Sequence, residues 1–134
     1  EAAAKGLHLN VDMSPTLGHV HTSRLYLEEM LQNFITNAIK YTKKGTVTVR
    51  VKQKLDVITF SIKDTGIGIS KSDQAKVFQK FYRSEDYRTR ETSGTGLGLY
   101  VAAKLSHKIN TKIELVSRLN YGSTFSFKLP VAKK

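Results

Sequence analysis

The sequence predicts an α/β fold, a two-layer sandwich in which helices cover one face of a mixed, mostly antiparallel sheet. Three observations predict it. Several segments alternate apolar and polar residues, which is the period of a half-buried strand. One long segment carries its apolar residues at helical spacing instead. The strand-like segments come mostly in neighbouring pairs separated by short turns, as in antiparallel hairpins.

The N-terminal part of the chain is expected to hold one strand and the clearest helix. EAAAK is a strong helix former, and residues 1–6 are therefore expected to be a linker or the end of a preceding helix. LHLNVDM predicts a strand, SPTLG breaks it, and HVH is expected to be its hairpin partner. Ser23 or Thr22 is expected to cap a helix that runs to about Tyr41. The buried stripe of this helix is Leu27, Met30, Leu31, Phe34, Ile35, Ala38 and Ile39.

The rest of the chain is expected to place two helices between two strand pairs. TVTVRVKQ and DVITFSIK predict strands on either side of a turn near Leu55 and Asp56. SKSDQAKVFQKF predicts a short helix that begins near Ser70, and LGLYVAAKLSHK predicts another. Between them, YRSEDYRTRETSGTG has almost no apolar residues and predicts a mobile loop. TKIELVSRL and STFSFKLPV predict a terminal hairpin around NYG.

Composition limits the class of protein. A chain of 134 residues is expected to be one domain, residues 1–134, with a real core. The absence of cysteine excludes disulfides and thiolate metal sites. No apolar run approaches the roughly 20 residues of a membrane span. The net charge of +11 is spread along the chain, which favours a solvated basic surface. Nucleotide phosphates or an acidic protein are the alternative partners, and nucleic acid is not expected.

Four polar residues share one face of the predicted helix, beside its apolar stripe. They are Asn33, Asn37, Lys40 and Tyr41. Asparagine is a poor helix former, so two of them one turn apart need a reason. One explanation is an exposed polar stripe. The other is an oxygen ligand for a hard cation such as Mg²⁺, with Lys40 on accompanying phosphates.

Glycine clusters mark three further points. In DTGIGI, residues 64–69, Gly66 and Gly68 permit close backbone approach to a ligand, and Asp64 can accept a hydrogen bond from an exocyclic amine. An ordinary turn after a strand is the alternative. GTGLGL, residues 94–99, opens a helix, where free N–H groups favour an anion. YGSTF taken alone predicts only a hairpin turn.

Together and in this order, these segments resemble the catalytic ATP-binding domain of sensor histidine kinases, in the superfamily that also holds gyrase, Hsp90 and MutL. NFITNAIKYT resembles the N box, DTGIGI the G1 box, FQKFYR the F box, GTGLGL the G2 box and GSTF the last glycine motif. The resemblance covers about residues 7–130. It implies the Bergerat ATP-binding fold, with ATP and Mg²⁺ as cofactors.

The resemblance also implies a role for each motif residue. Asp64 would bind the adenine amino group, with Gly66, Gly68 and Ile69 beside it and Thr124 joining through water. Asn37 would be the Mg²⁺ ligand, and Tyr41 would lie along the nucleoside. The phosphate contacts and catalytic residues would be Asn33, Lys40 and Arg83. The ATP lid would span residues 84–98, and the nucleotide contacts at its end would be Gly94, Thr95, Gly96, Leu97, Gly98 and Leu99. Phe78 and Phe81 are expected to anchor the lid to the core.

The activity that the resemblance implies is that of a protein-histidine kinase. Such a domain donates the γ-phosphoryl group of ATP to a histidine on a separate dimerisation domain, with a response regulator downstream. Hydrolases of the superfamily place a Glu four residues before the magnesium Asn, where this chain has Asn33, and an amide is no general base. Kinase is therefore favoured over a gyrase- or Hsp90-like ATPase or a nucleotide-sensing pseudokinase.

The acceptor histidine is expected to lie outside this sequence. The acceptor of sensor kinases is followed by acidic and Arg-Thr-Pro residues, and that setting is absent around each histidine of the chain, namely His8, His19, His21 and His107. The domain is accordingly expected to be monomeric and cytoplasmic, in a parent kinase that could be membrane-anchored.

Overall fold

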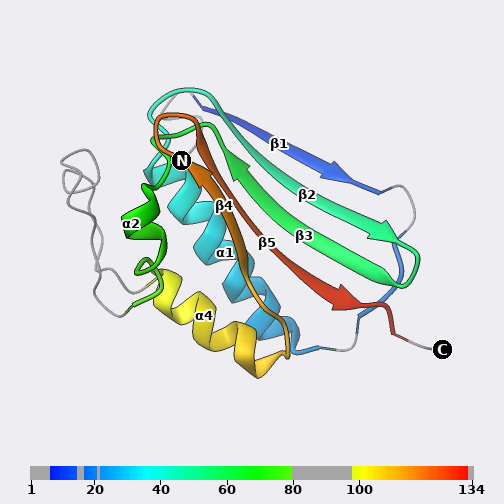
Figure 1. The fold of residues 1–134 in the computed structure, drawn as a ribbon. Coiled ribbons are helices and arrows are strands. Elements are labelled where there is room, and N and C mark those ends of the chain that lie inside the picture. Colours follow the sequence, from blue (N-terminus) through cyan, green and yellow to red (C-terminus); the bar gives the residue numbers. More distant parts are fainter. Residues whose placement is uncertain (1–6, 15–16, 21, 80–97, 133–134) are drawn as a thin grey trace.

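The computed structural model describes residues 7–14, 17–20, 22–79 and 98–132, and it is a two-layer α/β sandwich. A five-stranded sheet with the order β1-β2-β3-β5-β4 forms one layer, and the helices pack against one of its faces (Figure 1). This confirms the predicted fold class. The elements are β1 (His8–Met13), α1 (Arg24–Lys40), β2 (Thr46–Lys54), β3 (Val57–Asp64), α2 (Lys71–Gln74), α4 (Gly98–Lys108), β4 (Glu114–Arg118) and β5 (Gly122–Pro130).

The sheet is mixed because its first strand runs parallel to its neighbour. β2 with β3, β3 with β5 and β5 with β4 are antiparallel, and both predicted hairpins are confirmed. The predicted hairpin partner HVH is wrong, since the described residues 17–20 form no strand and β1 pairs with β2. The physical reason is α1, which lies between β1 and β2 in the chain. A helical crossover returns the chain to the end of the sheet from which it came, so the next strand is parallel.

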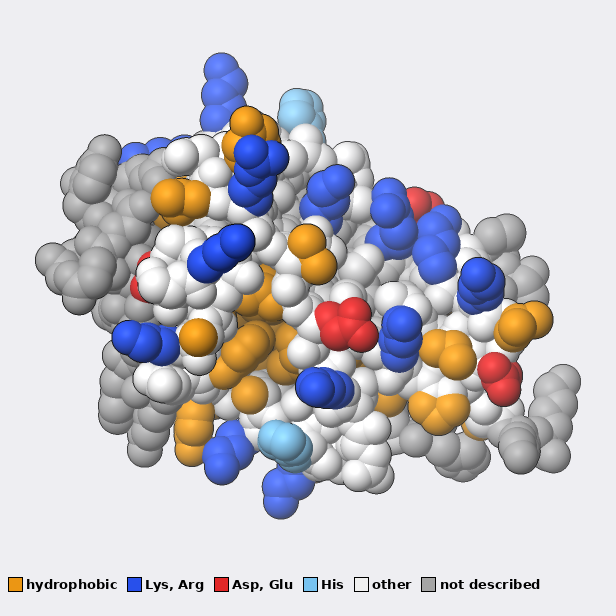
Figure 2. Space-filling model, viewed as in Figure 1, with side chains coloured by type: hydrophobic (Ala, Val, Ile, Leu, Met, Phe, Trp, Pro, Cys, Tyr) orange, Lys and Arg blue, Asp and Glu red, His pale blue; other side chains and the backbone are white. Residues whose placement is uncertain are grey.

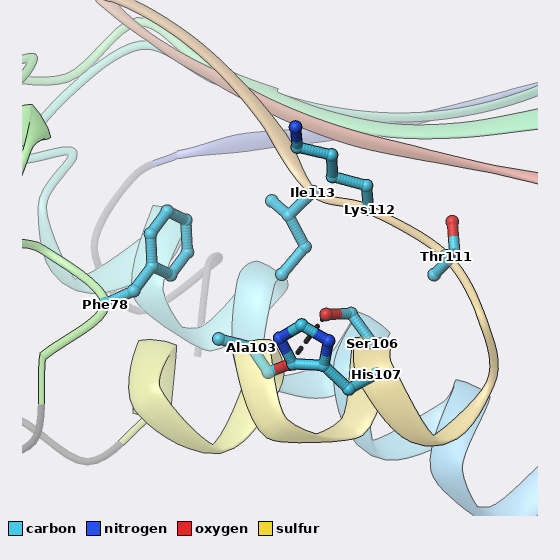
Figure 3. Close-up of a pocket in the computed structure, with 7 residues that line it drawn as sticks. All are labelled: Phe78, Ala103, Ser106, His107, Thr111, Lys112 and Ile113. Carbon is cyan, nitrogen blue, oxygen red and sulfur yellow. Dashed lines mark hydrogen bonds between the residues drawn. The ribbon is translucent and has the colours of Figure 1, made fainter.

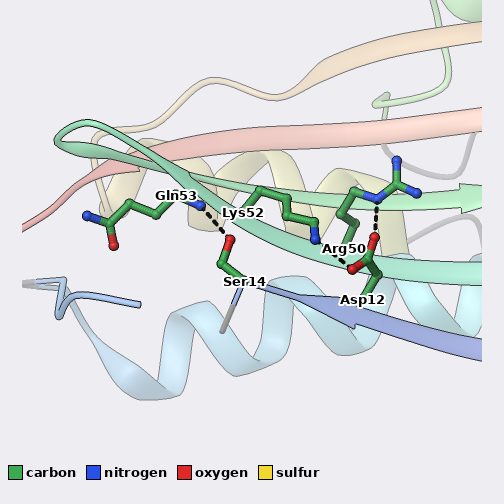
Figure 4. A network of polar contacts seen from close by, with 5 residues as sticks. All are labelled: Asp12, Ser14, Arg50, Lys52 and Gln53. Carbon is green, nitrogen blue, oxygen red and sulfur yellow. Dashed lines mark hydrogen bonds and ion pairs between the residues drawn. The ribbon is translucent and has the colours of Figure 1, made fainter. Parts of the chain in front are cut away.

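Side chains fix the register of the β1–β2 pair (Figure 4). Asp12 Oδ2 binds Arg50 Nε at 3.0 Å, and its Oδ1 binds Lys52 Nζ at 2.6 Å. The hydrogen bond from Lys52, followed by that from Arg50, lowers the pKa of the Asp12 carboxyl. Ser14 Oγ then accepts the backbone N–H of Gln53 at 3.1 Å. Exposed ion pairs contribute little stability, so these contacts specify the pairing of β1 more than they strengthen it.

The predicted stripe of α1 forms the centre of the core. Ser23 caps the helix, because its Oγ accepts the Tyr26 N–H at 3.2 Å. Phe34 is fully buried and stacks on Phe125 of β5, with ring centroids 5.1 Å apart. All the predicted stripe residues lie in or against the same core, which confirms the stripe: Leu27, Met30, Leu31, Phe34, Ile35, Ala38 and Ile39.

The helix predicted from Ser70 through the F box is much shorter than expected. Among the described residues 70–79, only Lys71–Gln74 is α-helical, and Ser70 Oγ caps it by accepting the Asp73 N–H at 3.2 Å. Tighter turns follow, because Lys76 N–H donates to the Asp73 carbonyl three residues earlier, at 2.8 Å. Serine and aspartate are poor helix formers. A tertiary hydrogen bond, from Gln74 Nε2 to the Ser117 carbonyl at 3.2 Å, also holds the end of the helix against β4.

The described residues contain no helix long and apolar enough to cross a membrane. On the face seen in Figure 2, lysine and arginine side chains are scattered over the surface and do not form one block. This agrees with the way that the basic residues are spread along the sequence.

Candidate functional site

The site is built around Asp64, the last residue of β3. Its side chain points to the helix side of the sheet, as do the buried Ile62 and Phe60, and the residue is only 6% exposed. Asp64 Oδ1 accepts the backbone N–H of Gly66 at 2.9 Å and that of Ser123 at 3.3 Å. The carboxylate therefore joins the loop after β3 to the neighbouring strand β5.

Burial raises the pKa of the Asp64 carboxyl, and the two backbone N–H donors from Gly66 and Ser123 act in the opposite direction. Both hydrogen bonds recorded for this side chain among the described residues end at Oδ1. Oδ2 is thus the oxygen that remains for a donor from a ligand. An ionised carboxylate only accepts hydrogen bonds, so the matching ligand group is an N–H or O–H.

Gly66 packs the loop against the end of α1. Ile67 N–H donates to the Tyr41 carbonyl at 3.2 Å. A Cβ on Gly66 would collide with that carbonyl oxygen and would stand 2.7 Å from Thr42 Oγ1 and 3.0 Å from Asp64 Oδ1. No side chain fits here, so the backbone of the loop lies directly on Tyr41 and Thr42.

Thr42 carries an unexplained polar atom beside Asp64. The residue is fully buried, and its Oγ1 has no hydrogen-bond partner among the described residues. A buried hydroxyl left without a partner costs about 1–3 kcal/mol. Such atoms are uncommon in folded proteins, and a bound ligand or an ordered water is the usual explanation. Sequence reasoning did not single out Thr42.

At two other motif positions only glycine fits, because φ is positive and a carbonyl group of another strand lies where a Cβ would stand. Gly68 has φ +73°, and a Cβ there would collide with the Arg118 carbonyl of β4. Gly122 has φ +127°, and a Cβ there would collide with the Asp64 carbonyl. The turn between β4 and β5 is also bonded to the loop, since Asn120 N–H donates to the Ile67 carbonyl at 2.6 Å. These glycines let the loop, β3 and the β4–β5 turn meet at one end of the sheet.

The expected place of Thr124 beside Asp64 is wrong by one residue. Thr124 lies opposite Lys63, while Ser123 lies opposite Asp64. Side chains alternate between the two faces of a strand, so Thr124 points away from the helix layer. Ser123 is 6% exposed and points to the same side as Asp64. The alternation of Phe125 and Phe127 in the sequence was the signal that could have identified Ser123.

The polar face of α1 links this loop to the start of α4. Asn33, Asn37, Lys40 and Tyr41 are each partly buried. Asn33 Oδ1 lies 3.7 Å from the position that a Cβ on Gly98 would take. Asn33 and Tyr41 are eight positions apart, which is about 12 Å along the helix. The structure thus brings the described parts of three predicted motifs to one side of α1, at the end of the molecule where β3 ends (Figure 1).

The remaining predicted residues divide into two groups. Ile69 is half-buried and held by hydrogen bonds to β4 and α2, and Leu99 packs against the core. Phe78 also packs on the core, edge-on to Phe125 at 6.1 Å between ring centroids, as expected. The other predicted residues lie outside the described part of the chain, as does most of the predicted lid: Phe81, Arg83, Gly94, Thr95, Gly96 and Leu97.

A separate hollow of about 360 Å³ lies between α4 and the segment that carries Phe78 (Figure 3). Its hydroxyl groups are already used within the fold, because Ser106 Oγ donates to the Ala103 carbonyl at 2.6 Å and Thr111 Oγ1 to the Lys128 carbonyl at 2.6 Å. It contains none of the predicted nucleotide contacts. Its lining is Phe78, Ala103, Ser106, His107, Thr111, Lys112 and Ile113.

Comparison with known proteins agrees with this arrangement. Among curated proteins, the chain is 36% identical over 129 residues to the aerobic respiration control sensor protein ArcB of Escherichia coli, covering 94% of this chain and 17% of ArcB. It is 35% identical over 124 residues to the histidine protein kinase SaeS of Staphylococcus epidermidis, covering 90% of this chain and 35% of SaeS. The chain therefore spans about a third or less of these relatives.

The likeness extends to a solved structure and to a family. Full-length ShkA, crystallised in complex with AMPPNP, superposes with a TM-score of 0.84 at 27% identity, over 99% of this chain and 28% of ShkA. Residues 22–133 match the family described as histidine kinase-, DNA gyrase B-, and HSP90-like ATPase. With its mixed sheet, its buried aspartate and its asparagine-bearing helix, the chain belongs to this family and is the ATP-binding catalytic domain of a sensor histidine kinase.

Proposed function

We propose that this domain binds Mg²⁺-ATP and donates the γ-phosphoryl group to a histidine on a separate dimerisation domain. The observation that carries the proposal is the buried Asp64 carboxylate, held at Oδ1 by two backbone N–H groups. A desolvated carboxylate with one oxygen left over suits a neutral donor such as an exocyclic amine.

The adenine end of the site lies at Asp64, next to the loop that Gly66 opens. Asp64 Oδ2 accepts a hydrogen bond from the adenine amino group, and the missing side chain of Gly66 lets the loop after β3 pack on Tyr41 and Thr42 next to that carboxylate. The Thr42 hydroxyl, which has no partner among the described residues, lies beside both Asp64 and Gly66, and a water that bridges it to the base would satisfy it.

The phosphate end of the site lies along α1, toward Gly98. Asn37 supplies an amide oxygen, the kind of ligand that Mg²⁺ takes in proteins, and phosphate oxygens and water complete such a site. When bound, the metal neutralises charge on the phosphates. Lys40 and Asn33 contact the phosphates, and Arg83 is proposed to join them on the strength of the sequence resemblance.

The chemistry needs positioning more than acid–base catalysis. A neutral imidazole nitrogen of the acceptor histidine attacks the γ-phosphorus with its own lone pair, the bond from phosphorus to the β–γ bridging oxygen breaks, and ADP leaves. No proton has to be removed from the attacking nitrogen before the bond forms. Asn33 therefore suffices where a water-activating enzyme needs a carboxylate.

The partners follow from the same proposal. Of the relatives, ArcB is a sensor protein by name and SaeS a histidine protein kinase by name, and this chain covers 17% and 35% of them. The acceptor domain and a downstream response regulator are the proposed partners.

A phosphotransfer assay tests the proposal. The chain, ATP labelled at the γ-phosphate and Mg²⁺ are mixed with a polypeptide that carries the acceptor histidine of the same kinase. We expect acid-labile label on that histidine and essentially none on His8, His19, His21 or His107. Asp64→Asn should strongly reduce labelling at ATP concentrations below saturation, whereas Asp56→Asn, at the exposed β2–β3 turn, should not. ATP hydrolysis near the median enzyme rate of about 10 per second without transfer would assign the domain to the ATPases instead.

A further inference from the structure

Three side chains form a polar row across the end of the sheet on the helix side. Asp64 of β3 lies opposite Ser123 of β5, and Ser123 lies opposite Ser117 of β4. Ser123 N–H donates to Asp64 Oδ1 at 3.3 Å, and Ser123 Oγ lies 2.7 Å from Ser117 Oγ. Ser117 is thus connected to the carboxylate through one intervening residue.

The hydrogen bonds of Ser117 determine where the Ser123 proton points. Ser117 Oγ is 3.0 Å from the carbonyl oxygen of Gly122, and a carbonyl only accepts, so the single Ser117 proton is used there. Ser117 Oγ also accepts the Ile69 N–H at 2.8 Å. We therefore assign Ser123 as the donor in the 2.7 Å contact between the two hydroxyls. Its proton points toward β4 and away from Asp64.

We propose that Ser117 is a positioning residue that makes the base-recognition edge of the site accept hydrogen bonds only. With its proton held by Ser117, the Ser123 hydroxyl can only accept further hydrogen bonds, as can the ionised carboxylate of Asp64 on the neighbouring strand. At the position of the group on C6, such an edge favours the amine of a 6-amino purine, which donates, over the carbonyl of a 6-oxo purine, which accepts. The inference rests on the proposed function, because it assumes that the base lies at Asp64.

Gln74 provides a control for the possibility that Ser117→Ala only loosens the loop that carries Ile69. Gln74 Nε2 donates to the Ile69 carbonyl at 2.8 Å and to the Ser117 carbonyl at 3.2 Å. Gln74 therefore binds the same loop to the same strand without contacting either serine hydroxyl. Gln74→Ala should weaken the binding of ATP and of inosine triphosphate by the same factor, so the ratio of the two affinities should not change. Ser126→Ala, on the other face of β5, should leave binding unchanged.

The test compares ATP with inosine triphosphate, which carries a 6-oxo group, by titration calorimetry on the chain with Mg²⁺. In Ser117→Ala the Ser123 hydroxyl no longer donates to Ser117. It can then donate to Asp64, in competition with the 6-amino group of ATP, or to the 6-oxo group of inosine triphosphate. We expect the preference for ATP to narrow by about fivefold, the usual effect of one hydrogen bond. Ser117→Thr keeps the hydroxyl and should restore the preference. In a Ser123→Ala background, Ser117→Ala should have no further effect on the ratio.

The outcomes separate this inference from the function on which it rests. If the wild-type chain shows no preference for ATP over inosine triphosphate, the assignment of Asp64 to adenine fails. If the wild type prefers ATP and Ser117→Ala weakens both nucleotides equally, as Gln74→Ala does, then Ser117 is only structural and this inference alone is overturned. A melting curve for each variant shows that the compared proteins are folded.

Discussion

Ser123 donates its backbone N–H to Asp64 across the β3–β5 pair, so strand pairing itself holds the carboxylate of the candidate site. The bond is 3.3 Å long and ends at the same oxygen that Gly66 binds. The side chain that we propose binds the ligand therefore also joins the loop after β3 to β5. This arrangement makes it possible to separate binding from folding by changing the charge of Asp64 without changing its shape.

Asp64→Asn should weaken ATP binding without harming the fold. The amide oxygen can still accept from Gly66 and Ser123, but its NH₂ group would face the adenine amine. A buried mismatch of this kind costs on the order of 1–3 kcal/mol, which is a loss of roughly 5- to 150-fold in affinity. Calorimetry measures the affinity and urea unfolding the stability. Unchanged ATP affinity in this variant would contradict the assignment.

The wild-type chain and Asp64→Asn should differ in how their stability depends on pH. Burial raises the folded-state pKa of Asp64 above its usual value of 3.8, so the folded chain binds this proton more tightly than the unfolded chain does. The stability that this contributes is present below pH 3.8 and is lost as pH rises through the raised pKa. Asp64→Asn should therefore gain stability relative to wild type as the pH rises from 3.8 through the raised pKa of Asp64. Asp12 has the opposite sign but is common to both proteins.

Thr42→Val should stabilise the nucleotide-free domain and reduce its response to ATP. The variant removes a buried hydroxyl that has no partner among the described residues, which is worth about 1 kcal/mol or more. It also removes the group that a bridging water would bind, so the rise in melting temperature on adding ATP should shrink. Thr48→Val, on the open face of β2, controls for the general effect of the substitution. A destabilised Thr42→Val protein would show that the hydroxyl is satisfied.

The motif glycines should fall into two classes when changed to alanine. Gly68→Ala and Gly122→Ala force a side chain into positive φ and against a carbonyl, so each should lose about 2–4 kcal/mol of stability. Gly98→Ala places a methyl in ordinary contact with Asn33 Oδ1, 3.7 Å away, and should change stability by less than about 1 kcal/mol. It should instead weaken nucleotide binding. Equal destabilisation of all three variants would count against this division.

Asn37→Ala should abolish magnesium-dependent phosphotransfer and leave α1 intact. Alanine is the better helix former, so the melting temperature should not fall. Labelling of the acceptor histidine should drop at least tenfold, because losing about 1.4 kcal/mol of metal-binding free energy already lowers an equilibrium constant by that factor. Gln32→Ala, exposed on the same helix, is the matched control. Transfer at the wild-type rate in Asn37→Ala would remove Asn37 from the metal site.

The sequence by itself determined the elements whose signal is local. The stripe of α1, its cap at Ser23 and the alternation of β2, β3 and β5 follow from periodicity, and each is found in the structure. The family could also be predicted, because the order of several short motifs is visible without coordinates. Asp64 could be identified from the sequence as well, because it is a charged residue at the end of an apolar strand.

Only the tertiary structure decided which residues meet. The parallel pairing of β1, the early end of α2 and the choice of Ser123 over Thr124 depend on partners far away in the chain. So do the buried hydroxyl of Thr42 and the direction of the Ser123 proton, which Ser117 determines from a third strand. Periodicity reports the face on which a side chain lies. It carries no information about which carbonyl or hydroxyl stands opposite, because that is set by how separate elements pack.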